Sequence, residues 1–184
     1  MGLLSELEPG LTGLDQLRAM SESMRQPPSH ETLAIALVWA ERGFVIVEAA
    51  PGGRHLNPAG IVHGGYIATI LYTACGCASH SALAPNTWVS TLELKVSYHR
   101  PVTTKTGKVR AEGCLLSISQ RTAFSEAKLM DESGNLLASA TSSLIVTPLR
   151  VAVSPQAPVS PVFRSCQSQH SHTSGRMDAG ATFP

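Results

Sequence analysis

Five residues spaced as N-x-x-G-x-x-H-G-G stand directly before a segment without formal charge; they are Asn57, Gly60, His63, Gly64 and Gly65. The first N–H groups of a helix have no internal partner, and together with the helix dipole they favour negative charge. Two glycines let a substrate atom come close to the backbone. The junction is therefore a candidate oxyanion site for acyl transfer, where each donor contributes roughly 3–4 kcal/mol.

The tripeptide His-Gly-Gly is a weak signal by itself, because glycine pairs are common and a loop histidine is usually solvated or capped. A flexible turn before a helix is the alternative. The residues that follow strengthen the functional interpretation. Apolar side chains recur at i, i+3, i+4, i+7 and i+11 from Ile67 to Ala78, which is one face of a helix. The other positions are small or neutral, so we expect this helix to be buried on several sides.

The remaining elements must position this junction. A short amphipathic helix is predicted first and is expected to end at Pro27-Pro28. Two short apolar runs then predict a hairpin, although the first could also be a helix, and a loop rich in Gly and Pro follows. Four longer strands come after the buried helix, and Gly113 is a possible bulge in one of them. The ranges are 11–24 for the first helix, 33–40 and 44–49 for the hairpin, 51–60 for the loop, and 90–101, 107–119, 121–134 and 136–146 for the four strands.

This order of elements predicts an α+β fold. Helices do not alternate with strands, which argues against a doubly wound α/β sheet. A long helix that is apolar all round requires a sheet wrapped around it, and a curled antiparallel sheet is the natural solution. The outer strands of such a sheet have open edges, which pairing with a second chain would cover.

Composition narrows the function classes. The chain has 184 residues, with 43% hydrophobic residues, 15% charged residues and a net charge of +1, so nucleic acid is a poor candidate partner. Four cysteines without a C-x-x-C pair predict free thiols in a reducing compartment. The N-terminal stretch lacks the pattern of a secretory signal, and residues 66–78 are too short to span a membrane. We therefore expect a soluble, cytoplasmic protein without membrane contact.

The junction, taken together with the segment STLELKVSYHRP at residues 90–101, resembles the hotdog-fold acyl-CoA thioesterases of the phenylacetic acid degradation type. The resemblance covers roughly residues 33–147. It implies a hotdog fold, in which a curved antiparallel sheet wraps around a central helix from Gly65 to about His80. It also implies that a homodimer or homotetramer hydrolyses an acyl-CoA thioester at the subunit interface. No cofactor is expected beyond the CoA thioester itself, which is the substrate.

The predicted organisation has three parts. Residues 1–30 form an N-terminal helical segment, and residues 31–148 form the hotdog domain. From residue 151 the chain is rich in Pro, Ser and polar residues and cannot bury enough surface to offset the entropy of ordering. We therefore predict that residues 149–184 form a disordered tail.

The resemblance also assigns roles to single residues. It implies that Gly64 donates its N–H to the thioester carbonyl and that Asn57 lies near that carbonyl or the attacking water. It implies that Thr91 helps to position water, with its neighbour Ser90 as the alternative. Strict alternation along the strand would turn Thr91 away from Leu92 and Leu94. His63 is expected to orient the loop, and a role as general base is the alternative.

The same resemblance implies an Asp or Glu on the central helix nine residues after His63, where this chain has Tyr72. Only about one free phenol in a thousand is ionised at pH 7. Tyr72 is therefore expected to donate a hydrogen bond rather than activate water, and losing a base costs about 10²–10⁴ in rate. Among the substitutes, Cys75 is expected to be a core thiol and Glu93 a solvated or paired residue on a strand face.

Two functions follow from these observations. The first is an acyl-CoA thioesterase whose activity is impaired by Tyr72, and the alternative is a non-catalytic module that binds acyl-CoA. Basic side chains near strand ends are candidates for the CoA phosphates, although each is equally an ordinary surface charge. They are Arg100, Lys105, Lys108 and Arg121. The histidines do not have convincing metal-ligand spacing, so no metal is expected.

Overall fold

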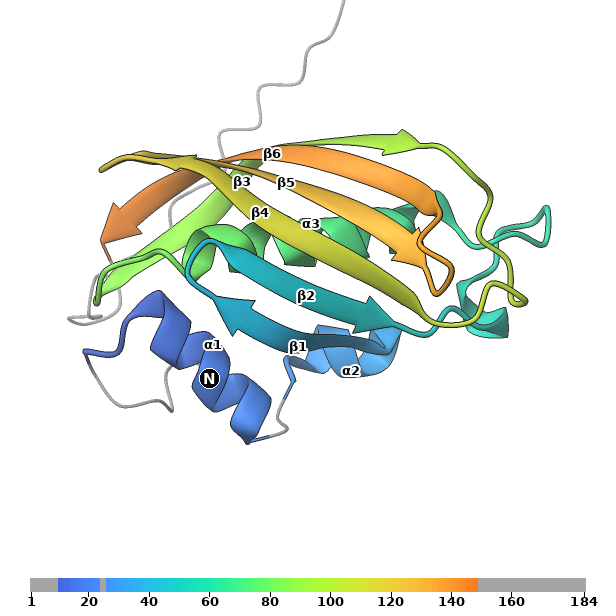
Figure 1. Cartoon of the computed structure of the whole chain (residues 1–184), viewed down its shortest axis with the longest axis horizontal. Coiled ribbons are helices and arrows are strands. Elements are labelled where there is room, and N and C mark those ends of the chain that lie inside the picture. The colour runs from blue at the N-terminus through green and yellow to red at the C-terminus, as the bar shows by residue number, and fades with distance from the viewer. Residues whose placement is uncertain (1–9, 24–25, 149–184) are drawn as a thin grey trace, which may run out of the picture. The chain divides into compact units, whose positions relative to one another are not determined.

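The computed structural model describes residues 10–23 and 26–148 (Figure 1). Six antiparallel strands form one sheet in the order β1-β2-β4-β5-β6-β3, and the sheet curves around helix α3. This arrangement confirms the predicted α+β hotdog fold. The strands are β1 (Ile35–Glu41), β2 (Phe44–Ala49), β3 (Thr87–Tyr98), β4 (Val109–Ile118), β5 (Thr122–Asp131) and β6 (Leu136–Pro148); the helices are α1 (Gly13–Glu22), α2 (Pro28–Leu33) and α3 (Gly64–His80), with a 3₁₀ turn at Gly53–His55.

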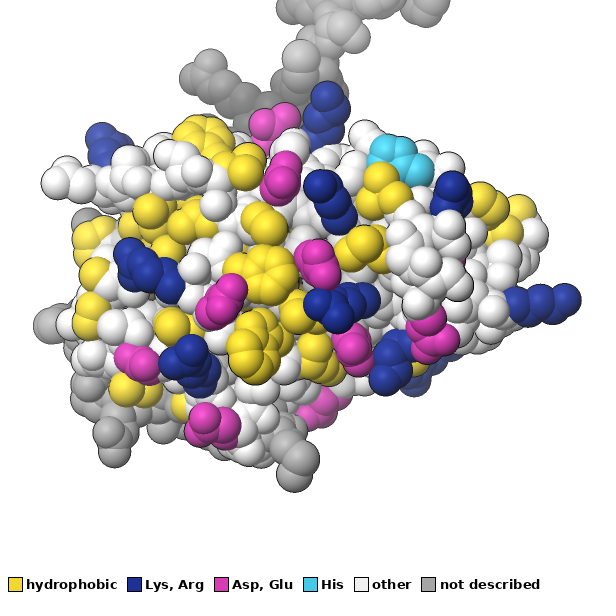
Figure 2. Space-filling view, viewed as in Figure 1, with side chains coloured by type: hydrophobic (Ala, Val, Ile, Leu, Met, Phe, Trp, Pro, Cys, Tyr) yellow, Lys and Arg dark blue, Asp and Glu magenta, His cyan; other side chains and the backbone are white. Residues whose placement is uncertain are grey.

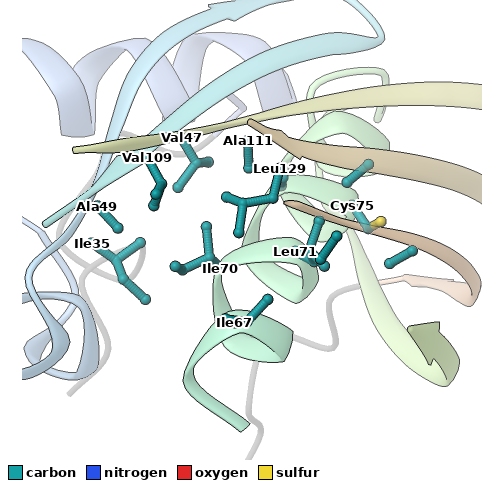
Figure 3. Close-up of a cluster of buried hydrophobic side chains, with 14 of the residues drawn as sticks. Ile35, Val47, Ala49, Ile67, Ile70, Leu71, Cys75, Val109, Ala111 and Leu129 are labelled. Atoms are coloured by element: carbon teal, nitrogen blue, oxygen red, sulfur yellow. The ribbon is translucent and has the colours of Figure 1, made fainter. Parts of the chain in front are cut away.

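The core lies between α3 and the inner face of the sheet. Ile70, Leu71 and Ala74 of α3 are completely buried, as the apolar period predicted. Figure 3 shows Val47 of β2 and Leu129 of β5 among the side chains that surround them. Fully burying one such aliphatic side chain contributes about 1.5–3 kcal/mol. Packing of this kind fixes the position of α3, and therefore of the junction that begins it.

The outer face of the sheet is exposed and mixed in character. Along β2, buried Val45 and Val47 alternate with Phe44 and Ile46, which are only partly covered. Figure 2 shows a face of the molecule on which hydrophobic side chains lie among Lys, Arg, Asp and Glu. One buried and one solvated face is typical of an antiparallel sheet.

The prediction of a bulge at Gly113 is wrong. Gly113 pairs in regular register with Val45 and Ala127, and the irregularity in β4 lies further on, between Leu115 and Ser117. Gly113 is required for a different reason. A Cβ atom at this position would lie 2.3 Å from the Ala74 carbonyl oxygen, so the helix backbone passes too close to β4 for any side chain.

Gly113→Ala is expected to lower the free energy of unfolding by about 1–3 kcal/mol, because the new methyl group would force α3 away from the sheet. Urea denaturation of both proteins measures the change. Gly53→Ala is the matched control, since a Cβ atom there would meet nothing within 4 Å. If the Gly113→Ala and Gly53→Ala variants have the same free energy of unfolding, the result would contradict a close approach of α3 to β4 at Gly113.

The N-terminal helix α1 confirms the helix predicted over residues 11–24. A capping box between Thr12 and Asp15 starts it. Gly13 donates its N–H to the Leu83 carbonyl at 3.1 Å. A Cβ atom on Gly13 would lie 1.8 Å from the His80 carbonyl oxygen, so α1 docks through its glycine onto the end of α3.

The short helix α2 was not predicted. Pro28, which the sequence interpretation used only to end the first helix, is the first residue of α2, where its fixed φ suits a helical turn. The helix ends at Leu33, and its C-cap Ala34 has a φ of 52° in the left-handed region. As a result β1 begins at Ile35 rather than at Leu33.

His80 makes stability depend on pH. Its side chain is 5% exposed, its Nε2 lies 2.8 Å from the Gln16 Oε1, and its ring meets Trp88 edge-on. Burial lowers the pKa of His80 to about 4, from 6.5. The unfolded chain therefore binds more protons between these values, so stability is full above pH 6.5 and falls as the pH drops towards 4.

We expect the wild type to lose about 2–3 kcal/mol of unfolding free energy through His80 between pH 7.5 and pH 4.5. His80→Gln removes the titrating group and should lose correspondingly less over the same interval. Urea denaturation of both proteins at the two pH values measures the difference. Equal losses in the two proteins would contradict this role.

The predicted disordered tail, residues 149–184, lies outside the described residues. Within residues 10–23 and 26–148, no helix is long and apolar enough to cross a membrane.

Candidate active site

The first turn of α3 is capped by His63 of the junction itself. His63 is the N-cap of the helix, and its Nδ1 accepts a hydrogen bond from the Gly65 N–H at 2.9 Å. A neutral imidazole that accepts at Nδ1 carries its proton on Nε2. Such a ring is a donor towards its surroundings, and in this geometry it caps the first turn of α3.

Gly64 is the first residue of α3, and its backbone N–H is open. Among the hydrogen bonds of the described residues, none is donated by the Gly64 N–H. The neighbouring donors are engaged, since Gly65 bonds the His63 ring and Tyr66 bonds the His63 carbonyl at 3.0 Å. A free donor at the positive end of a helix dipole can bind a carbonyl oxygen that gains negative charge.

Asn57 shapes the loop that leads to the junction. Its Oδ1 accepts from the Ala59 N–H at 2.9 Å and the Ile61 N–H at 3.3 Å, and its own N–H bonds the Ile61 carbonyl. Gly60, with a φ of +77°, completes the turn. The Oδ1 is therefore occupied, and the side-chain NH₂ is the group of Asn57 left for a substrate or water.

The loop is pinned to the fold behind it. The His63 N–H donates to the His55 carbonyl at 2.7 Å, and the Val62 N–H donates to the Val102 carbonyl at 2.9 Å. The ring of His55 stacks on Tyr66 with centroids 3.9 Å apart. Burial, and secondly the charge of Arg54, lower the pKa of His55. The sequence interpretation considered His55 only as a metal ligand and missed this supporting role.

Tyr72 lies on the open face of α3. Gly65, Thr69, Tyr72 and Gly76 follow one another at helical spacing, and none of them is buried. The Tyr72 side chain is 48% exposed. At a rise of about 1.5 Å per residue, Gly64 and Tyr72 are separated by about 12 Å along the helix. One thioester carbonyl therefore cannot contact both residues of the same chain.

Thr91 faces the helix, which corrects the expectation from strict alternation. The register of β3 shifts between Thr91 and Glu93, so Leu92 is an extra residue in the strand and is 65% exposed. This bulge reverses the side-chain phase. Thr91 pairs with buried Leu144, and it faces inward as Leu94 does beyond the bulge.

The two candidates for the water-positioning role lie on opposite faces of the sheet. Ser90 is exposed on the other face from Thr91, as Glu93 is. Thr91 lies about 20 Å along β3 from Tyr98, at the end of the strand that contacts Gly64. A single chain therefore brings together Asn57, His63 and Gly64, and it leaves Tyr72 and Thr91 apart from them.

Tyr98 belongs to the junction, although the sequence interpretation did not include it. Its hydroxyl donates to the Gly64 carbonyl at 2.8 Å, and its side chain is 54% exposed. A Cβ atom on Gly64 would lie 3.1 Å from the Tyr98 hydroxyl oxygen. The sequence SYHRP predicts only the end of a strand, and nothing in it marks Tyr98 as part of a site.

The structure also shows the surroundings of several other candidates. Cys75 is completely buried, and burial raises the pKa of its thiol to about 11, which excludes an easily formed thiolate. Lys108 pairs with Glu48 at 3.3 Å. Arg100 and Lys105 line a shallow hollow that also contains acidic side chains.

Comparison with known proteins identifies relatives of this arrangement. Residues 59–138 match the family model of the thioesterase superfamily, a range that contains all of α3 and the junction residues except Asn57. No curated protein sequence matches the chain.

Three solved structures illustrate the similarity. A thioesterase from Haemophilus influenzae is 20% identical over 72% of this chain and 91% of its own, with a TM-score of 0.65. A mutant of the phenylacetic acid degradation protein PaaI from Thermus thermophilus is 25% identical over 64% of this chain and 97% of its own, with a TM-score of 0.58. A Streptococcus mutans protein bound to acetyl-CoA is 25% identical over 62% of this chain and 89% of its own, with a TM-score of 0.57.

Proposed function

We propose that this chain, which has the hotdog fold and matches the thioesterase superfamily model over residues 59–138, hydrolyses an acyl-CoA thioester to the free acid and CoA. The observation that carries this proposal is the open N–H of Gly64 at the start of α3. Acetyl-CoA bound to the similar Streptococcus mutans protein supports a CoA thioester as the substrate class.

The reaction needs few groups from the protein. A water oxygen attacks the thioester carbon, and the Gly64 N–H stabilises the negative charge that develops on the carbonyl oxygen. The intermediate collapses with cleavage of the carbon–sulfur bond. The electron pair passes to sulfur, and the proton released by the attacking water reaches the CoA thiolate through solvent. His63 and Asn57 hold the junction in the geometry that this step requires.

A second copy of the chain would complete the site. Tyr72 lies about 12 Å along α3 from Gly64, so a residue 72 that acts on the same thioester must come from another chain. Within the part of the chain that the structure describes, β3 is an edge of the sheet, and one side of its 12 residues offers unpaired backbone groups to a neighbour. We therefore infer a homodimer, alone or paired into a homotetramer, with the site shared between chains.

Tyr72 favours one alternative function, which is binding of acyl-CoA without hydrolysis. A phenol in the position that the family gives to a carboxylate supplies no base at neutral pH. The chain would then bind acyl-CoA without turnover, and it would keep the same junction for the carbonyl oxygen.

A steady-state assay of CoA release tests the proposal over acyl-CoAs with acetyl, longer aliphatic and phenylacetyl groups. Hydrolysis of one or more of them supports the proposal. Isothermal titration calorimetry with the same esters distinguishes the alternative, which predicts binding without CoA release. Neither hydrolysis nor binding of any ester would refute both functions.

A further inference from the structure

Hydrogen bonds engage almost every polar atom of the two peptide groups that flank Gly64. The His63–Gly64 peptide is fixed through its carbonyl, which accepts from Tyr66 at 3.0 Å and Ile67 at 3.3 Å. The Gly64–Gly65 peptide is fixed through its N–H, which bonds the His63 ring. Its carbonyl receives the hydroxyl of Tyr98 at 2.8 Å. The Gly64 N–H is the exception, and the orientation of this donor depends on the bonds that surround it.

Tyr98 differs from the other groups that hold Gly64. The bonds from His63, Tyr66 and Ile67 lie within one helical turn, so they are local and form with α3 itself. Tyr98 comes from β3, and its hydroxyl reaches across 34 residues of sequence to the Gly64 carbonyl. It is therefore the contact among these that ties the first turn of α3 to the sheet.

The ring of Tyr98 also limits the space at Gly64. A Cβ atom on Gly64 would lie 3.1 Å from the Tyr98 hydroxyl oxygen and 3.2 Å from its Cζ, so the ring covers that side of the glycine. Tyr98 is 54% exposed, so it also borders the space outside the junction.

We propose that Tyr98 is the positioning residue of the oxyanion site: it anchors the Gly64–Gly65 peptide, and through it the first turn of α3, so that the free N–H of the adjoining His63–Gly64 peptide points at the thioester oxygen. This inference rests on the proposed function and extends it. Tyr98 acts through Gly64 and does not exchange a proton with the substrate. A donor whose direction is fixed before the substrate arrives stabilises developing charge better than one that must reorient.

Tyr98→Phe tests the proposal, because it removes the hydroxyl and keeps the ring. We expect kcat for acyl-CoA hydrolysis to fall about tenfold while KM stays within about twofold. Ser142→Ala is the matched control. It removes a hydroxyl that also donates to the backbone carbonyl of a distant segment, that of Glu93, at the same distance of 2.8 Å. The control should retain the wild-type kcat.

A second readout does not need turnover. A methyl ketone analogue of acetyl-CoA, with a methylene in place of sulfur and a ¹³C-labelled carbonyl, is bound to each protein and examined by difference infrared spectroscopy. The carbonyl band should move to lower frequency in the wild type and in Ser142→Ala, and most of this shift should be lost in Tyr98→Phe.

The outcomes separate this inference from the proposed function. If no ester is hydrolysed but the infrared shift depends on Tyr98, the hydrolase function fails and the positioning role stands. If esters are hydrolysed and Tyr98→Phe keeps both the wild-type kcat and the infrared shift, the positioning role fails and the function stands. An unshifted ketone band in the wild type also overturns the positioning role.

Discussion

Tyr72→Asp is expected to raise kcat for acyl-CoA hydrolysis by about 10²–10⁴-fold, which is the usual contribution of a positioned general base. The structure should tolerate this substitution. Tyr72 is 48% exposed on the open face of α3, so replacing it removes little packing from the core. The new carboxylate is ionised at neutral pH and can take a proton from the attacking water.

Tyr72→Asn is the control for this prediction, because asparagine has the size of aspartate and cannot act as a base. Steady-state kinetics of the wild type and both variants should show a gain for Tyr72→Asp alone. An equal gain in Tyr72→Asn would mean that the bulk of tyrosine limits the wild type rather than the missing base. No gain in either variant would contradict the role given to position 72.

Gly64→Pro should lower kcat by about 10²–10³-fold, because it deletes the proposed oxyanion donor. Proline is tolerated here as a backbone, since position 64 is the first of the helix and needs no internal N–H bond. His63 already has φ −60° and ψ 131°, which suits a residue before proline.

Gly64→Ala is the matched control, because it adds the same Cβ atom beside Tyr98 and keeps the N–H. The comparison is made in the Tyr72→Asp background, where turnover is expected to be greater, and kcat is measured for both variants. The loss should be much greater for proline than for alanine. Similar losses would assign the effect to the added atoms, and the donor role of Gly64 would fail.

The sequence was sufficient for the central helix and the junction, because both depend on local patterns. The charge-free segment with apolar residues at helical spacing is α3, and His-Gly-Gly begins it. The four later strands follow from alternation and from their turns. In each case the signal lies within a dozen neighbouring residues, and burial then selects a single face.

The features that the sequence did not reveal depend on contacts between distant segments. Gly113 looks like a bulge, but it is a glycine because Ala74 of α3 passes against it. The bulge at Leu92 has no glycine to mark it, and it alone turns Thr91 towards the helix. In the sequence Tyr98 is an ordinary strand residue, and only the folded sheet places its hydroxyl on the Gly64 carbonyl. Patterns within a short stretch of sequence carry no information about contacts between distant segments.

The separation of Gly64 from Tyr72 is a simpler consequence of helix geometry. Eight residues of helix place them about 12 Å apart, which follows from the sequence numbers once α3 is recognised. The second chain that would bring the two positions together is not encoded in any local pattern, so the shared site remains a proposal.

The central claim is that the Gly64 N–H binds the carbonyl oxygen of an acyl-CoA. A crystal structure of the protein with the methyl ketone analogue of acetyl-CoA tests it most directly. We predict that the ketone oxygen lies about 2.7–3.1 Å from the Gly64 nitrogen, at the start of α3. A ketone oxygen that is bound elsewhere, with the Gly64 N–H facing water or another protein group, would contradict the claim.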